Sequence, residues 1–321
     1  MMIVVTGGAG FIGSCIVSRL NARGHSDLIV VDHLDDFKNK NLEEKKFLQY
    51  FDKKDFLDLL KNDQVNFKVS CIIHMWACSS TTLNDARYFE ENNFEYSCHI
   101  ARWALKHQAR FIYASSAATY GDGSRGYQDD EAAIPRLKPL NLYGQSKQKF
   151  DEWVLKQNAF DKMAGLKFFN VFGPNEYHKG DMRSVIAKAY EKVSTEGKIA
   201  LFKSYNPQYK DGEQKRDFIY VKDAVDIVMY FFDNPSINGL FNVGAGRART
   251  WNDLAQALFQ AVNKPAKIEY IDMPQVMRPK YQYFTQADMR KLRKAGYQKS
   301  FTPLEEAVKD YAGYLKDGRY L

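Results

Sequence analysis

Short, uninterrupted apolar runs alternate with amphipathic stretches through the first half of the chain. The runs that we predict to be strands are residues 2–6, 28–32, 71–77, 110–116 and 166–172. The predicted helices cover about residues 12–23, 85–107 and 146–158. Strands that alternate with helices are typical of a parallel sheet, and continuous apolar strands indicate a sheet that is covered on both faces. The pattern therefore predicts an α/β fold with a doubly wound, Rossmann-like parallel sheet.

The order of elements is less regular after about residue 170. A strand at 216–221, a helix, and a strand within 239–246 suggest one more βαβ unit that extends the first sheet. We therefore predict a large domain of residues 1–172 that is extended by about 216–246. Residues 173–215 and about 247–321 would form a smaller, mixed α/β lobe.

The smaller lobe carries its own helix signals. We expect a helix after Thr250 and a strand at 266–271. The segment "TPLEE" predicts a last helix in which Thr302 is the cap, Pro303 lies in the first turn and Glu305 completes a capping box.

Composition narrows the class of protein. The chain has 321 residues, with 45% hydrophobic and 26% charged residues and a formal charge of +7. This charge favours anionic partners such as nucleotides, but the basic residues form no dense stripe, so we do not expect nucleic-acid binding. No C-x-x-C pair, signal peptide or membrane-length apolar run is present, so we expect a cytoplasmic protein without a membrane segment or a metal ion. The four cysteines are Cys15, Cys71, Cys78 and Cys98.

A glycine-rich turn, "TGGAGFIG", follows the first predicted strand. Gly8, Gly10 and Gly13 fit G-x-G-x-x-G, and Gly7 with Gly10 and Gly13 fits a longer variant. Glycines at this point allow a tight turn and close approach of the backbone to a pyrophosphate at a helix N-terminus. The position between a strand and a helix predicts a dinucleotide site.

The residues after the second strand leave the choice of dinucleotide open. Asp32 ends that strand and is placed to accept hydrogen bonds from a ribose 2′-hydroxyl, which favours NAD. Lys38, Lys40 and Lys53 follow, and any of these lysines could instead neutralise the 2′-phosphate of NADP.

A second motif, "NLYGQSK", places Tyr143 and Lys147 four residues apart at the start of a predicted helix. Residues at this spacing lie on one face of a helix. Ser115 and Ser116 end the fifth strand, where ligands of an open α/β sheet collect. We predict that Tyr143 is an acid/base, that Lys147 favours its phenolate form and holds ribose hydroxyls, and that Ser116 bonds the reacting oxygen.

Together these motifs resemble the extended short-chain dehydrogenases/reductases that act on nucleotide sugars. A narrower resemblance is to the ADP-L-glycero-D-manno-heptose 6-epimerases. The segments that carry it are "ACSSTT", "NN" at 92 and 93, "YASSAATYG", "FNVFGPNEYHKG", "RDFIYV", "FNVGAGRA" and "YQYFTQAD". They span nearly the whole chain, and "YHKG" with "FTQAD" is the most specific part.

The resemblance implies an activity in the synthesis of the lipopolysaccharide core precursor. C6 of ADP-D-glycero-D-manno-heptose would be oxidised to a ketone, and hydride would return to the opposite face to give the L-glycero epimer. Proton exchange at the two opposite faces of the ketone requires two acid/base groups, and Lys179 matches the position of the family's second acid/base residue. The resemblance also implies NADP as cofactor and a homo-oligomer, a pentamer.

Further site residues are implied by the same resemblance. Those expected at the dinucleotide, besides the glycines, Asp32, Tyr143, Lys147 and Lys179, are Phe11, Ile12, His33, Lys38, Lys53, Met75, Trp76, Ala77, Cys78, Ser79, Asn92 and Val171. Those expected at the ADP-sugar are Ser116, Asn170, Asp181, Lys188, Phe202, Lys203, Ser204, Arg216 and Tyr281. Arg216 is placed to hold the diphosphate with two hydrogen bonds.

The chain departs from the family pattern at a few points. Residues 74–77 read His-Met-Trp-Ala where His-Glu-Gly-Ala is expected, and Asp181 replaces a smaller neutral residue. A one-residue gap after Asp32 makes Lys38 and Lys40 competing candidates for the 2′-phosphate.

Three other functions were weighed. A nucleotide-sugar 4-epimerase could work with Tyr143 alone. A 4,6-dehydratase needs an adjacent Asp-Glu pair that "SSAATYG" lacks. A non-catalytic dinucleotide sensor is disfavoured because Ser116, Tyr143 and Lys147 are all present.

Overall fold

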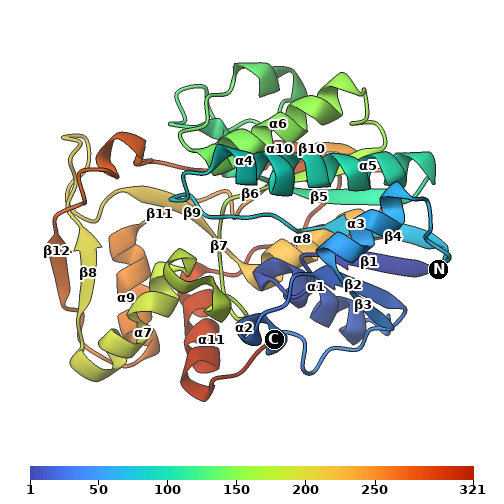
Figure 1. The fold of residues 1–321 in the computed structure, drawn as a ribbon. Coiled ribbons are helices and arrows are strands. Elements are labelled where there is room, and N and C mark those ends of the chain that lie inside the picture. The colour runs from blue at the N-terminus through green and yellow to red at the C-terminus, as the bar shows by residue number, and fades with distance from the viewer.

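A seven-stranded parallel sheet forms the centre of the molecule (Figure 1). The computed structural model describes residues 1–321, apart from the side chain of Lys280. The strand order is β10-β6-β5-β4-β1-β2-β3, and neighbouring strands pair in parallel. The bounds are β1 (Met2–Thr6), β2 (Leu28–Asp32), β3 (Gln49–Asp52), β4 (Val69–His74), β5 (Arg110–Ser116), β6 (Met163–Phe168) and β10 (Gly239–Val243). The predicted doubly wound α/β fold is confirmed.

Helices cover both faces of this sheet, as its apolar strands require. On one face α1 (Phe11–Ala22) packs beside α8 (Val221–Asp233). The other face is covered by α3 (Lys53–Lys61), α5 (Tyr96–Lys106) and α6 (Leu142–Lys156). Each face has its own apolar core, so the sheet is held rigidly between two layers.

The carboxyl-terminal part adds smaller sheets and helices, on the left of Figure 1. β7 (Asn170–Phe172), β9 (Lys215–Tyr220) and β11 (Ala248–Thr250) form a three-stranded sheet, and β8 (Ile199–Phe202) pairs with β12 (Ile268–Ile271). The helices around them are α7 (Val185–Glu196), α9 (Trp251–Ala261) and α11 (Leu304–Asp317). The remaining short helices are α2 (Asp36–Asn39), α4 (Ala86–Phe89) and α10 (Arg290–Lys294). None of the helices in the described part of the chain is both long and apolar enough to cross a membrane.

Two predictions about strands were wrong. The run 166–172 is not one strand, because β6 ends at Phe168 and β7 begins at Asn170 in a different sheet. Of the predicted βαβ unit at 216–246, β10 joins the central sheet, whereas β9 pairs with β7 and β11. Apolar composition shows that a strand is buried but does not show which sheet buries it. The division into two domains stays a prediction.

The predicted cap of the last helix was also wrong. α11 begins at Leu304, and Pro303 occupies the N-cap position. Thr302 instead uses its hydroxyl and amide to donate to the carboxylate of Asp223, at 3.0 and 2.7 Å. The threonine therefore ties the start of α11 to α8 rather than capping its own helix.

Candidate active site

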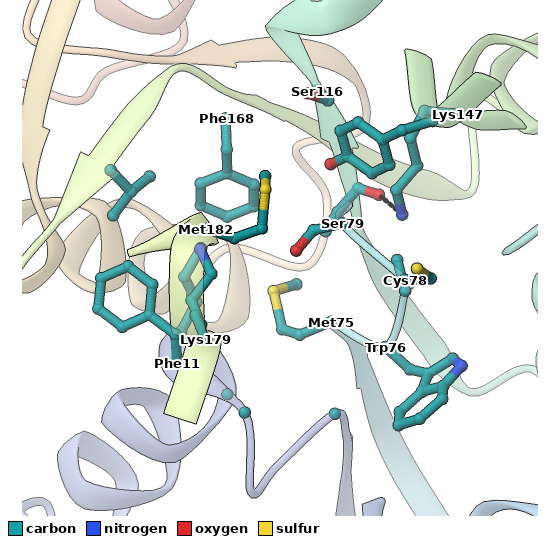
Figure 2. Close-up of a pocket in the computed structure, with 18 of the residues that line it drawn as sticks. Phe11, Met75, Trp76, Cys78, Ser79, Ser116, Lys147, Phe168, Lys179 and Met182 are labelled. Atoms are coloured by element: carbon teal, nitrogen blue, oxygen red, sulfur yellow. Dashed lines mark hydrogen bonds between the residues drawn. The ribbon is translucent and has the colours of Figure 1, made fainter. Parts of the chain in front are cut away.

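A cavity of about 480 Å³ opens at the carboxyl ends of β1, β4 and β5 (Figure 2). This edge of an open α/β sheet is where ligands bind. All four predicted catalytic residues line the cavity: Ser116, Tyr143, Lys147 and Lys179. The predicted dinucleotide residues that line it are Gly7, Gly10, Phe11, Ile12, Gly13, Asp32, Lys38, Met75, Trp76, Ala77, Cys78, Ser79 and Val171. Folding thus brings together residues that are widely separated in the sequence, from Gly7 to Lys179.

The glycine-rich turn has the shape that a pyrophosphate needs. Gly7 has a φ of +68°, which favours glycine, and a Cβ on Gly13 would lie 2.0 Å from the carbonyl oxygen of Gly7. Gly10 stands at the N-cap of α1, where it has no side chain to accept hydrogen bonds from the first amides. These amides are therefore available to an anion in the cavity, and the turn fits a dinucleotide.

Asp32 is already hydrogen-bonded within the protein. Its side chain is buried and accepts from the amide of Ala9 at 2.9 Å and the amide of His33 at 2.7 Å. The ammonium of Lys38 donates to the same carboxylate at 3.0 Å. The carboxylate that would bind a ribose 2′-hydroxyl is thus partly occupied by a lysine.

Two lysines converge on the indole of Trp76. Lys53 Nζ lies 4.4 Å and Lys38 Nζ 5.2 Å from the centre of the Trp76 ring. Lys53 also donates to the side-chain oxygen of Asn92 at 2.5 Å, so Lys53 and Asn92 lie beside the cavity although they do not line it. Lys40 is exposed at the C-cap of α2 and lines no part of the cavity. Of the competing lysines, the structure brings Lys38 and Lys53 together.

His33, a predicted dinucleotide residue, has an exposed side chain. Its side chain is 65% exposed, and its Nδ1 lies 3.1 Å from the carboxylate of Asp52. It does not line the cavity.

Tyr143 and Lys147 lie in the first turns of α6, which begins earlier than predicted. Asn141 caps this helix by accepting from the amide of Gly144 at 2.8 Å. Lys147 is buried, and its ammonium donates to the carbonyl oxygen of Ala114 at 2.8 Å. Ser116 lies at the end of the adjacent strand β5. Tyr143 and Lys147 are therefore anchored between a capped helix and the central sheet.

Burial has the largest effect on the pKa values of both Tyr143 and Lys147. Burial raises the pKa of the Tyr143 phenol, and a hydrogen bond with Ser116 partly offsets this rise. Burial lowers the pKa of Lys147 to about 8, and the negative charge of Asp151 opposes that shift. Loss of water thus disfavours the charged form of each side chain.

Lys179 lies on the opposite side of the cavity from Lys147 (Figure 2). It belongs to η4 (Tyr177–Met182), a short 3₁₀ helix after β7. Its ammonium lies 5.3 Å from the centre of the Phe11 ring, and burial lowers its pKa. Desolvation disfavours the charged form of this lysine, which makes its ammonium a stronger proton donor. Two groups capable of acid/base chemistry therefore flank one cavity.

The predicted ADP-sugar residues are spread more widely. Lys188, Phe202 and Tyr281 line a second cavity of about 400 Å³ between α7, β8 and the start of α9. Arg216 is buried beside it, with its guanidinium 5.0 Å from the ring centre of Tyr281 and 5.7 Å from that of Trp251.

The other predicted ADP-sugar residues line neither cavity. Asn170 and Asp181 are exposed. Lys203 pairs with Asp272 at 3.2 Å, and the amide of Ser204 donates to Asp211 at 2.7 Å.

Several residues at the first cavity were missed. Those that line it are Tyr88, Ala114, Ser115, Phe168, Phe169, His178 and Met182. Most of them lie next to a predicted residue in the sequence. For Ala114, Ser115, Phe168 and Phe169, the available signal was their position at or just beyond the ends of β5 and β6. Burial lowers the pKa of His178 to about 4, and its Nδ1 lies 3.2 Å from the side-chain amide nitrogen of Asn41.

A π-helical turn, which the sequence did not indicate, shapes the rim of the cavity. It interrupts the predicted helix 85–107 at Glu90–Glu95. There Asn93 accepts from the amide of Cys78 at 2.8 Å and donates to its carbonyl oxygen at 2.9 Å. The same amide group donates to Ser146 in α6 at 2.9 Å. Turns of this kind are frequent at functional sites.

Comparison with known proteins agrees with this geometry. Residues 3–244 match the NAD dependent epimerase/dehydratase family. The chain is 52% identical to an ADP-L-glycero-D-manno-heptose-6-epimerase of Nitratidesulfovibrio vulgaris, over 97% of this chain and 96% of that one. The solved ADP-L-glycero-D-manno-heptose-6-epimerase of Helicobacter pylori superposes with a TM-score of 0.79 at 26% identity, covering 98% of this chain and 96% of that one. A UDP-glucose 4-epimerase of Thermotoga maritima, solved with UDP-glucose, has a TM-score of 0.81 at 26% identity and covers 99% of both chains. The chain therefore belongs to the NAD dependent epimerase/dehydratase family and, within it, to the ADP-L-glycero-D-manno-heptose-6-epimerases.

Proposed function

We propose that the protein interconverts ADP-D-glycero-D-manno-heptose and ADP-L-glycero-D-manno-heptose by inverting C6 of the heptose. The observation that carries this proposal is the placement of Tyr143 and Lys179 at one cavity that also contains the glycine-rich turn. The C6–H bond is not acidic, so inversion requires transient oxidation of the C6 hydroxyl to a ketone. A nicotinamide cofactor supplies this oxidation and the following reduction when it is bound.

The protein side chains move the protons. Tyr143 exchanges a proton with the C6 oxygen in one orientation of the heptose, and Lys179 does so after the ketone has turned in the cavity. Ser116 donates a hydrogen bond to the same oxygen beside Tyr143, and Lys147 binds the cofactor ribose. The two acid/base groups give each face of the ketone its own proton donor.

The ADP end of the substrate occupies the second cavity in this proposal. Met182 lines the first cavity and Val185 the second, so the short segment that leads into α7 runs from one cavity to the other. Arg216 is a buried cation beside the second cavity. One guanidinium nitrogen donates to the carbonyl oxygen of Lys215 at 2.8 Å, and its other donors would bind the diphosphate.

Replacing Arg216 by methionine tests this placement. We expect KM for the nucleotide sugar to rise about 30-fold or more, because losing one partner of a buried charge pair costs on the order of 2 kcal/mol or more. The cofactor Kd should stay unchanged. Arg23→Met is the matched control, since Arg23 is a surface residue paired with Asp233. An unchanged KM in Arg216→Met with an intact fold would contradict a diphosphate contact.

We further propose NADP as the preferred cofactor. Lys38 and Lys53 share the Trp76 site, and Lys38 already neutralises Asp32, so a 2′-phosphate would meet two ammonium groups there.

The substitutions Lys38→Met and Lys53→Met should therefore change the preference of the protein for NADP over NAD. Each variant should weaken NADP binding by about tenfold or more, the size of one charge-assisted hydrogen bond, and change NAD binding much less. Fluorescence titration with NADPH and NADH measures both constants, and Lys40→Met serves as the control because Lys40 is exposed and remote. Equal losses for both cofactors would show that these lysines do not read the 2′-phosphate.

The assembly and setting of the protein are also proposals. We propose a homo-oligomer, specifically a pentamer, working in the cytoplasm on the precursor of the lipopolysaccharide core. Sedimentation equilibrium of the purified chain measures the mass of the assembly directly. A monomeric mass at micromolar concentration would contradict the proposed homo-oligomer.

A comparison of substrates tests the proposed function against its nearest alternative. The purified protein with NADP or NAD is offered ADP-D-glycero-D-manno-heptose and, separately, UDP-glucose, and the products are resolved by NMR. We expect inversion of the heptose at C6 and negligible inversion of glucose at C4. The opposite result would assign a 4-epimerase.

A further inference from the structure

A fully buried ion pair lies behind the first cavity. Lys167 of β6 donates to the carboxylate of Asp151 of α6 at 2.7 Å, and the two side chains are 1% and 0% exposed. A buried pair gains little stability over apolar residues of similar size, because both charges lose their water. Stability alone therefore does not explain this pair. What the pair provides locally is a fixed geometry and an electric field.

The carboxylate of Asp151 joins α6 to the strand that carries Ser116. It accepts from the hydroxyl of Tyr113 at 3.0 Å and from that of Ser115 at 2.7 Å. Lys167 also donates to the hydroxyl of Thr119 at 2.6 Å, just beyond the end of β5. The pair is thus satisfied by hydroxyl groups of β5 and of the turn that follows it, and it fixes α6 against β5.

This network is continuous with the proposed catalytic residues. Tyr143, Lys147 and Asp151 follow one another at intervals of four along α6, so they share one face of the helix. Lys147 donates to the carbonyl oxygen of Ala114, which lies between Tyr113 and Ser115. Asp151 therefore holds the two residues on either side of the backbone group that holds Lys147.

The charges near Lys147 come from several elements. The titratable groups on these elements whose side chains are buried or line the cavity are Tyr143 and Asp151 of α6, Tyr113 of β5, Lys167 of β6 and His74 of β4, with Cys78 just beyond β4. Asp151 raises the pKa of Lys147 against the larger effect of burial. Burial lowers the pKa of His74 to about 3, so this ring is neutral at physiological pH.

We propose that the Asp151–Lys167 pair is a positioning element, which keeps Tyr143 and Lys147 in place against β5 and sets the electric field at the Lys147 ammonium. Its use in catalysis rests on the proposed function, but the field itself exists without substrate. Removing either partner leaves the other as an uncompensated buried charge. The two single variants therefore act on Lys147 in opposite directions.

The test is the titration of Lys147 in protein labelled with carbon-13 at the lysine Cε, with the Lys147 signal assigned from a Lys147→Arg variant. In Asp151→Asn the remaining Lys167 cation should lower the titration midpoint, and in Lys167→Met the remaining Asp151 anion should raise it. Each shift should be about one pH unit, a tenfold change in proton affinity, as charged neighbours produce at buried sites. Lys167→Arg keeps the charge and should restore the midpoint of the unmodified protein.

If the Asp151–Lys167 pair served only the stability of the fold, the titration of Lys147 would give a different result. Both variants would then lose thermal stability while Lys147 titrated as before, and the proposal would be overturned. If Asp151→Asn or Lys167→Met does not fold, Ser115→Ala removes one donor to Asp151 and should shift the midpoint of Lys147 upward by a smaller amount; no shift overturns the proposal. The titration needs no substrate, so it can succeed even if the protein does not act on a heptose.

Discussion

Tyr143→Phe should lower kcat/KM for the nucleotide sugar by about 10²- to 10⁴-fold, which corresponds to roughly 3 to 5 kcal/mol of transition-state stabilisation. The change removes the phenol oxygen that exchanges the proton and keeps the ring. Cofactor affinity should stay within about threefold, because Lys147 and the glycine-rich turn remain. Steady-state kinetics and fluorescence titration of the cofactor measure the two effects.

Tyr88→Phe is the matched control for this variant. Tyr88 also lines the cavity and lies outside the Tyr143, Lys147 and Ser116 cluster. We expect it to keep nearly full activity. If Tyr143→Phe kept full activity as well, or if the two variants were equally impaired, Tyr143 would not be the acid/base.

Lys179→Met should cause a loss of similar size, about 10²- to 10⁴-fold in kcat, because one of the two faces of the ketone loses its proton donor. The double variant with Tyr143→Phe gives the sharper result. If the two residues act in successive half-reactions, every turnover passes through both, and their losses do not multiply. The double variant should then be within about threefold of the slower single variant.

Two outcomes contradict this two-base account. Full activity in Lys179→Met would show that Tyr143 serves both faces. A double variant whose loss is the product of the single losses would show that both groups act on the same transition state. Lys188→Met is the control for removing a lysine, since Lys188 is an exposed residue of the second cavity whose loss should affect KM rather than kcat.

Much of the fold was predictable because its signals are local. The strand–glycine turn–helix unit around Gly7 and Gly13 and the apolar runs of β1, β2, β4 and β5 follow from periodicity and turn chemistry. The break between Phe168 and Asn170 was not predictable, since the apolar run continues across the point where the chain changes sheets.

The site was predictable where its residues lie at strand ends or within one helix. Tyr143 and Lys147 were found in this way. Lys179 was found only through the resemblance, because it lies on a short 3₁₀ helix whose approach to Phe11 depends on long-range packing. The influence of Asp151 on the pKa of Lys147 was missed altogether, since no local pattern reveals that Asp151 is buried.

Inversion of C6 through oxidation and reduction at the same carbon is tested most directly by converting ADP-D-glycero-D-manno-heptose in deuterium oxide and examining the C6 position of the product by NMR. We expect the L-glycero epimer with ordinary hydrogen retained at C6, because that hydrogen never exchanges with water. Deuterium at C6, or no epimer with either nicotinamide cofactor, would contradict it.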